Sequence, residues 1–216
     1  MNNINTVVFD LDGTLLDTLD DLANSVNFAL SSHGYPQRSK DEIRSFLGNG
    51  IESLMHKSLP TGISQENFEI SFQCFREHYV QHCLDLTKPY PGIMQLLKTL
   101  KEKGVKMAIV SNKLDPAVKE LNQRFFSQYI DSAVGESATV RRKPNPDAVI
   151  TALHNLGSSK ENAVYVGDSE VDIETSKNAG IACICVTWGF RDKEFLTQLK
   201  PEILIDNPSE ILQHLP

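Results

Sequence analysis

Acidic residues follow two short apolar runs of the sequence. Asp10 and Asp12 come directly after the run TVVF, and Asp168 and Asp172 come after the run AVYV. If both runs are strands of one parallel sheet, these carboxylates meet at its carboxyl edge, where such sheets bind ligands. Carboxylates this close repel one another unless a cation neutralises them, and an oxygen-only ligand set suits Mg²⁺. The sequence therefore predicts a magnesium site.

Hydroxyl, amide and ammonium groups are available from two further segments. Ser111, Asn112 and Lys113 end the apolar run MAIV, and Lys143 lies just before a helix pattern. Ser111 can donate a hydrogen bond to a phosphoryl oxygen, and Lys143 adds a point charge that offsets charge developing in a transition state. Asn112 and Lys113 are candidate substrate contacts, with a solvated surface position as the competing interpretation of Lys113.

Asp10 is the candidate nucleophile of this set. A carboxylate that attacks phosphorus forms an acyl phosphate, and a metal and a lysine screen the charge of the substrate. Asp12 fits a general acid and base, because residues two apart on an extended segment point the same way. Gly13 and Thr14 form a turn that aims backbone N–H groups at a phosphate. Together these residues favour hydrolysis of a phosphate ester.

Apolar runs alternate with helical patterns over most of the chain. The runs are residues 6–9, 107–110, 163–166 and 181–186, and the helical patterns span 93–100, begin at Asp115-Pro116, and run from Asn145-Pro146 to Gly157. Strands that alternate with helices predict an α/β fold, with a doubly wound parallel sheet of the Rossmann-like kind.

Residues 17–88 break this alternation, because they hold several helical segments and no convincing strand. Ser39 and Glu42 have the spacing of a capping box, and an aromatic stripe marks a later helix as packed against a core. We therefore expect a helical cap domain at 17–88, inserted into a core made of 1–16 and 89–216, with hinges near 16–18 and 88–91.

A glycine-rich tripeptide begins one helix of this expected cap. Gly48, Asn49 and Gly50 are candidate substrate contacts, and a plain loop between two helices is the alternative interpretation. Side chains of a cap that closes over a site would limit substrate size and exclude bulk water.

Four motifs in order carry a resemblance to a known family. The segment Phe9–Leu15, FDLDGTL, resembles the signature of the haloacid-dehalogenase-like superfamily, and Val110–Lys113, Lys143–Pro144 and Gly167–Asp172 follow in the expected order. The helical insertion directly after the first motif is similar to the cap of the phosphoglycolate phosphatase-like branch. The resemblance covers nearly the whole chain.

This resemblance implies a phosphatase that acts through a phosphoryl-aspartate. It implies Asp10 as nucleophile, Asp12 as acid and base, Ser111 and Lys143 as phosphate ligands, Mg²⁺ held by Asp10, the Asp12 carbonyl and Asp168, and Asp172 as a supporting acidic residue. The substrate would be a small phosphomonoester such as phosphoglycolate, a nucleotide or a sugar phosphate. A sugar phosphomutase of the same superfamily and a non-enzymatic, receiver-like phospho-accepting module are the alternatives.

Composition narrows the partners and the compartment. The 216 residues carry a formal net charge of -7, which disfavours a nucleic-acid-binding surface, and they contain no apolar run long enough to span a membrane. The N-terminal residues 1–5 lack the pattern of a secretory leader, and the four cysteines are expected to be free thiols. We therefore expect a soluble cytoplasmic enzyme, a monomer or small homo-oligomer, whose partner is a small phosphorylated metabolite.

Overall fold

The computed structural model describes residues 4–215. The N-terminal segment 1–5, for which no secretory leader was predicted, therefore lies partly outside the described residues. The chain divides into two compact units. One unit combines Met1–Leu15 with Pro89–Pro216, and the other is Leu16–Lys88. We call them the core unit and the helical unit.

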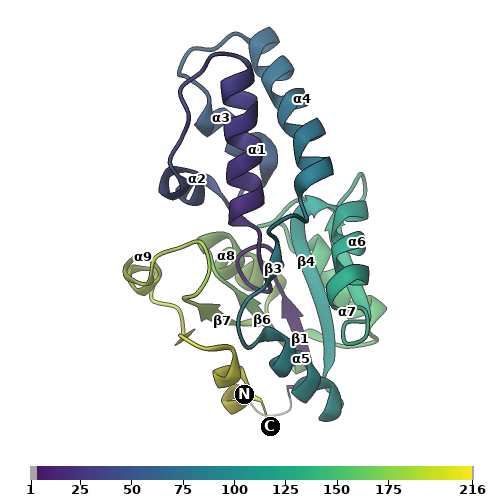
Figure 1. The fold of residues 1–216 in the computed structure, drawn as a ribbon. Coiled ribbons are helices and arrows are strands. Elements are labelled where there is room, and N and C mark those ends of the chain that lie inside the picture. The colour runs from purple at the N-terminus through teal and green to yellow at the C-terminus, as the bar shows by residue number, and fades with distance from the viewer. Residues whose placement is uncertain (1–3, 216) are drawn as a thin grey trace. The chain divides into compact units, whose positions relative to one another are not determined.

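The core unit is built on a six-stranded sheet with the strand order β5-β4-β1-β6-β7-β8. Its strands are β1 (Thr6–Phe9), β4 (Lys106–Leu114), β5 (Ser132–Glu136), β6 (Ala163–Gly167), β7 (Ala182–Val186) and β8 (Ile203–Ile205). Every neighbouring pair is parallel. Figure 1 shows β1 between β4 and β6. The doubly wound parallel sheet predicted from the sequence is confirmed.

The order of connections decides where the site lies. The chain builds β4 and β5 on one side of β1 and then returns to build β6, β7 and β8 on the other side. Val8 is in register with Ala108 of β4 and Tyr165 of β6. The carboxyl ends of β1, β4 and β6 therefore lie side by side at the switch point, the usual ligand site of such sheets.

Strand β1 forms because its residues suit a strand that is buried on both faces. All four residues of TVVF are buried, and β-branched side chains pack well in such a strand. On one face Val8 packs in a cluster with Ala108 of β4 and with Val149 and Ala152 of helix α7 (Asp147–Asn155). The strand therefore holds its last residues, and Asp10 after them, in a rigid position.

The remaining core helices follow the strands. They are α5 (Ile93–Glu102), α6 (Asp115–Phe125), α8 (Glu170–Ala179) and α9 (Lys193–Gln198), with 3₁₀ segments at Lys160–Asn162 and Pro208–His214. Proline in the first turn begins α6, and a capping box begins α8. The helices predicted after Gly92, at Asp115-Pro116 and after Asn145-Pro146 are present.

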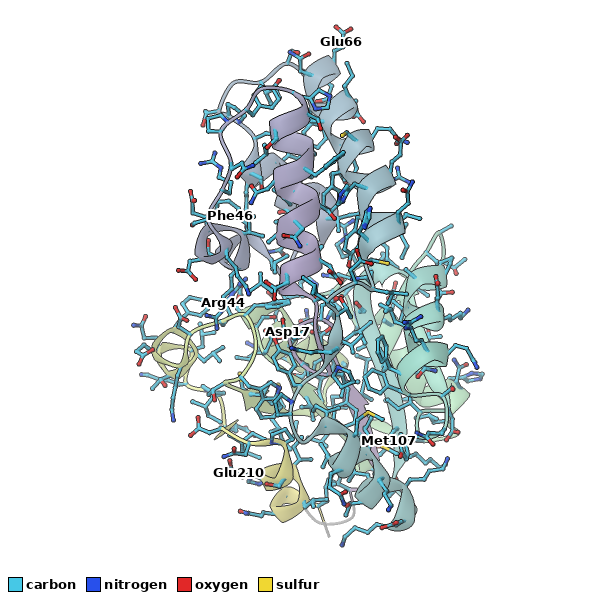
Figure 2. The ribbon with its side chains drawn as sticks, in the orientation of Figure 1. Asp17, Arg44, Phe46, Glu66, Met107 and Glu210 are labelled. Carbon is cyan, nitrogen blue, oxygen red and sulfur yellow. The ribbon has the colours of Figure 1, made fainter. Side chains whose placement is uncertain are left out.

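The helical unit consists of α1 (Leu19–Ser32), α2 (Lys40–Phe46), α3 (Gly50–Ser58) and α4 (Gln65–His82). The predicted capping box is present, because Ser39 accepts from the Glu42 N–H and Glu42 accepts in return. Figure 1 shows α1 and α4 running side by side, and Figure 2 shows Glu66 in the first turn of α4. The aromatic stripe of α4 packs inward at Phe68, Phe75 and Tyr79.

Two very short strands lie where the chain passes between the units. β2 (Leu16–Asp17) pairs with β3 (Lys88–Pro89), and neither was expected from the sequence.

Among residues 4–215, none of the helices combines the length and apolar character that crossing a membrane requires. All four cysteines lie in the described part and are free thiols, as predicted.

Candidate active site

Asp10 is the first residue after β1, and its side chain is buried against a lysine. The carboxylate oxygen Oδ1 of Asp10 lies 2.7 Å from Lys143 Nζ, and the same ammonium lies 2.8 Å from Oδ1 of Asp172. The backbone N–H of Asp10 donates to the carbonyl of Val166 on β6, which continues the sheet to the site. The structure therefore joins Asp10 to Lys143, 133 positions further along the chain, and Lys143 to Asp172, 29 positions beyond it, in one network.

Tyr165 belongs to this network, although the sequence predicts only that it lies in a strand. Its hydroxyl donates to Oδ1 of Asp172 at 2.9 Å and accepts from Lys143 Nζ at 3.1 Å. Asp10, Asp172 and Tyr165 thus accept the three N–H groups of the ammonium. An aromatic residue inside a buried strand reads as core, so the sequence held no signal for this hydroxyl.

Asp172 has both carboxylate oxygens occupied. Oδ1 accepts from Lys143 and Tyr165, and Oδ2 accepts from the N–H and hydroxyl of Ser169 at 3.1 and 2.6 Å. These Ser169 contacts are the capping box of α8. A Cβ on Gly167 would collide with the Asp172 side chain, so this close packing requires glycine there. The contacts favour Asp172 as a support for Lys143 over Asp172 as a metal ligand.

Asp168 is the first residue after β6 and is held by donors from two other segments. Oδ1 accepts from the Thr14 hydroxyl at 3.1 Å, and Oδ2 accepts from the Phe190 N–H at 2.7 Å. Gly13 has φ of +94°, and a Cβ there would lie 2.8 Å from Asp168 Cγ. The turn at Gly13 and Thr14 is therefore built against Asp168.

Two buried acidic groups of the site, Asp10 and Asp168, have raised pKa values, so a bound cation would favour their charged forms. Burial raises the pKa of Asp10 well above its usual range, with Lys143 opposing and the charges of Asp172 and Asp168 adding to the rise. Burial and then the charge of Asp172 raise the pKa of Asp168 to about 7. Burial lowers the pKa of Lys143, but Asp10 and Asp172 more than offset this, and it lies above its ordinary value.

The donor set fits a divalent cation. One oxygen each of Asp10, Asp168 and Asp172 lies within 4.8 Å of the others, and all three residues are buried. A single lysine faces three carboxylates, so a bound cation would relieve the remaining repulsion. Each oxygen of Asp172 accepts two hydrogen bonds, whereas Oδ1 of Asp168 accepts from Thr14 and Oδ2 from Phe190, so Asp10 and Asp168 have more capacity for it than Asp172.

Asp12 lies in a separate ion pair at the edge of the site. Its Oδ1 is 2.8 Å from Lys113 Nζ, and its Oδ2 is 3.5 Å from the Ser111 hydroxyl. The side chain of Lys113 is only 10% exposed. The structure therefore places Lys113 inside the site and rejects the solvated-surface interpretation.

Asn112 follows Ser111 on β4 and contacts main chain. Its Oδ1 accepts from the Lys143 N–H at 2.6 Å, and its Nδ2 donates to the Lys143 carbonyl at 3.3 Å. These two bonds fix the backbone that carries the active-site lysine. Substrate binding by Asn112 stays a prediction, whereas its support of Lys143 is observed.

Gly48, Asn49 and Gly50 belong to the helical unit, at the beginning of α3. Gly50 has φ of +80° and Gly48 has φ of +106°, so both occupy backbone conformations that favour glycine. This conformation explains the glycines without a substrate, and the substrate contact remains a prediction.

Comparison with known proteins identifies the family. The family model described as haloacid dehalogenase-like hydrolase matches residues 7–186, which include all four motifs and the residues of the core network. The chain belongs to this family. The resemblance read from the sequence is thereby confirmed.

Relatives of this haloacid dehalogenase-like hydrolase are phosphatases. A phosphoglycolate phosphatase of Aquifex aeolicus is 35% identical over 96% of this chain and 94% of its own length. Phosphoglycolate phosphatase 1 of Pseudomonas aeruginosa is 34% identical over 95% of this chain and 78% of its own length. The predicted class of enzyme, a phosphatase, is confirmed.

Solved structures agree on the fold. A proposed phosphoglycolate phosphatase from Lactobacillus delbrueckii subsp. bulgaricus has a TM-score of 0.92 at 32% identity and covers 97% of both chains. A haloacid dehalogenase-like hydrolase from Streptococcus pneumoniae has a TM-score of 0.88 at 25% identity and covers 99% of both chains.

Proposed function

We propose that this phosphatase hydrolyses a small phosphomonoester by forming a phosphoryl-aspartate on Asp10, with phosphoglycolate as the first substrate to test. The observation that carries the proposal is the buried carboxylate of Asp10, 2.7 Å from Lys143 and at the switch point of the sheet. The choice of phosphoglycolate rests on the names of the relatives from Aquifex aeolicus and Pseudomonas aeruginosa.

The first half of the reaction transfers the phosphoryl group to the enzyme. A carboxylate oxygen of Asp10 forms a bond to phosphorus while the bond from phosphorus to the ester oxygen breaks. Asp12 gives a proton to the leaving oxygen, and the alcohol departs. Lys143 and the Ser111 hydroxyl bind the phosphoryl oxygens and offset the charge that develops on them.

The second half returns Asp10 to its starting state. Asp12 now takes a proton from a water molecule, the water oxygen forms a bond to phosphorus, and the bond between Asp10 and phosphorus breaks. Inorganic phosphate is released, and Asp12 again carries the proton needed for the next ester. One group therefore serves as acid and then as base.

Asp10, Asp168 and the Asp12 carbonyl would hold a Mg²⁺ ion, which would supply positive charge next to the phosphoryl oxygens. Lys143 keeps its charge through Asp172 and Tyr165, whatever occupies the carboxylate pair. We also propose a cytoplasmic location, which suits the four free cysteine thiols.

The experiment is a panel of phosphate esters assayed side by side for phosphate release with Mg²⁺ present. It includes phosphoglycolate, a nucleotide, a sugar phosphate and an aryl phosphate, and a phosphorylated sugar is also checked for isomerisation. Many turnovers on at least one small ester support the proposal. Isomerisation without net phosphate release would identify a mutase, and a single equivalent released would identify a phospho-accepting module.

A further inference from the structure

The segment Trp188–Arg191, between β7 and α9, reaches back to the active site. The indole N–H of Trp188 donates to the carbonyl of Thr14 at 3.0 Å, and the Phe190 N–H donates to Oδ2 of Asp168 at 2.7 Å. A Cβ on Gly189 would collide with Asp168 and with the Gly13 carbonyl. We call this segment the Asp168 clasp.

An ion pair between the buried Arg191 and the partly exposed Glu170, whose side chain is 37% accessible, fastens the clasp. Arg191 donates through Nε and Nη2 to the two carboxylate oxygens of Glu170 at 2.7 and 2.8 Å. The Arg191 side chain is 10% exposed, and Glu170 lies in the first turn of α8, two residues after Asp168. The pair therefore joins the residue after Phe190, whose N–H donates to Asp168, to the residue that begins α8.

The geometry suits positioning better than stabilisation. A partly exposed ion pair contributes little net stability, because screening by solvent and the cost of desolvating the buried charge offset the attraction. A two-pronged guanidinium contact, however, fixes the relative orientation of the two segments that it joins. In this chain the segments are those that place Asp168 and the N–H bonded to it.

We infer that the Arg191–Glu170 pair is a positioning device for the metal site: it keeps the Phe190 N–H on Oδ2 of Asp168 and so fixes the carboxylate whose Oδ1, which also accepts from the Thr14 hydroxyl, would bind the cation. Neither residue contacts the reacting atoms. The inference deepens the proposed function, because it rests on Asp168 being a metal ligand. Removal of a residue that orients a metal ligand commonly lowers metal affinity by about 10- to 100-fold.

The experiment compares three variants with the wild-type chain. Arg191→Lys keeps the charge and loses the two-pronged contact, and Glu170→Gln keeps the shape and loses the charge. Arg141→Lys is the matched control, because Arg141 makes a similar two-pronged contact with Asp147 at 2.7 and 2.9 Å on the surface of the same unit. That pair is exposed, so its loss should change little.

The first readout is hydrogen exchange of the Phe190 N–H in metal-free protein, which requires neither Mg²⁺ nor activity. Arg191→Lys and Glu170→Gln should speed this exchange about tenfold, as loss of about 1.4 kcal/mol of local protection would do. Arg141→Lys should leave it unchanged. Exchange at the wild-type rate in both clasp variants would overturn the inference.

The second readout is Mg²⁺ binding by calorimetry without substrate, followed by turnover at saturating Mg²⁺. The clasp variants should bind Mg²⁺ roughly tenfold more weakly and keep turnover within about threefold once saturated. Faster exchange with unchanged Mg²⁺ affinity would also overturn the inference. A wild-type chain that binds no Mg²⁺ would contradict the proposed metal function and, with it, this role of the clasp, whatever the exchange rates.

Discussion

The core unit and the helical unit bury different kinds of side chain. The core unit buries four titratable groups, Asp10, Lys143, Asp168 and Asp172: Lys143 donates to Asp10 and Asp172, and Asp168 accepts from Thr14 and Phe190. The helical unit instead stacks aromatic rings along and against α4, at His56, Phe68, Phe72, Phe75 and Tyr79. The buried groups of the core unit can take part in a reaction, whereas the stacked rings of the helical unit contribute packing.

Asp21, a buried carboxylate of the helical unit, sharpens this contrast. Asp21 accepts from the backbone N–H groups of Leu86 and Thr87 at 3.0 and 2.8 Å. It ties the beginning of α1 to the segment that leaves α4. Its bonds to main chain are structural, whereas the core carboxylates face a lysine and one another. We propose that bond making belongs to the core unit and substrate selection to the helical unit.

Replacing Asp10 should have the largest effect. Asp10→Asn removes the nucleophile, because an amide cannot form the phosphoryl intermediate, and turnover should fall below detection while the melting temperature stays near that of the wild type. Phosphate release and a thermal melt measure both. Asp131→Asn, an exposed aspartate whose side chain is 59% accessible, is the control and should stay fully active. Activity of Asp10→Asn within tenfold of the wild type would refute the nucleophile assignment.

Removing the proposed acid and base should have the next largest effect. Asp12→Ala should lose on the order of 10²- to 10⁴-fold in turnover, because proton transfer to the leaving oxygen is lost. The loss should be smaller for an aryl phosphate, whose leaving group needs less help, than for an alkyl phosphate. Equal losses for the two substrates would show that Asp12 is not the acid.

The Tyr165 hydroxyl tests whether the buried network serves the chemistry. Tyr165→Phe removes one partner of Lys143 and one of Asp172, and a lost bond to a charged group costs about 1.5–3 kcal/mol. Turnover should therefore fall about 10- to 100-fold, with little change in apparent Mg²⁺ affinity. Tyr129→Phe, at a half-buried position outside the site, is the control. Full activity of Tyr165→Phe would mean that Asp10 and Asp172 hold Lys143 without help from the hydroxyl.

Acidity should weaken metal binding through Asp168. Its pKa of about 7 means that a proton competes with the cation below neutral pH, so apparent Mg²⁺ affinity should fall up to tenfold per pH unit below about 7. A carboxyl whose pKa is raised by folding stabilises the metal-free protein below about pH 4, and this contribution is lost as the pH rises toward 7.

Thermal melts with chelator and with Mg²⁺ test both expected pH dependences, that of the metal-free stability and that of Mg²⁺ binding. The metal-free melting temperature should fall between pH 5 and pH 8, because folded Asp168 loses its proton in this range. The rise in melting temperature on adding Mg²⁺ should be larger at pH 8 than at pH 5. Asp168→Asn should flatten both curves. Mg²⁺ stabilisation that does not depend on pH would contradict the assignment of Asp168 as a ligand.

The smallest effect concerns the helical unit. Glu52 lies in the first turn of α3, next to the glycine-rich tripeptide, and Glu66 lies in the first turn of α4. Glu52→Gln should change relative rates across the ester panel a few-fold, on the order of 1 kcal/mol, with Mg²⁺ affinity unchanged. Glu66→Gln is the matched control. If the two variants keep the wild-type ranking of substrates, the role of this segment in selection is wrong.

Much of the core could be predicted because its signals are local. The run TVVF marks β1 at its observed bounds, and a proline marks the beginning of α6. β5 has the sequence SAVGE and β8 has three residues, so neither shows the long β-branched run that marks a buried strand. Short strands at sheet edges form through pairing with a neighbour, which a single sequence does not display.

The candidate site divides in the same way. The acidic and basic residues that end strands could be selected, because the topology of a parallel sheet brings strand ends together. Tyr165 and Arg191 could not, because a tyrosine in a buried strand and an arginine in a loop carry no signal of their distant partners. Glu170 and Arg191 meet across 21 positions, and the Phe190 donor is main chain. Such contacts follow from the fold and not from residue type.

The central claim is that the phosphoryl group passes through Asp10, and the most direct test is to find it there. The enzyme is mixed with excess substrate and Mg²⁺, quenched in acid within the first turnovers, digested and examined by mass spectrometry for a phosphorylated peptide that contains Asp10. We expect phosphate on Asp10 in the wild-type chain and in Asp12→Ala, in which hydrolysis of the intermediate is slowed. Rapid turnover with no phosphorylated Asp10 in either protein, or phosphate on another residue, would contradict the account.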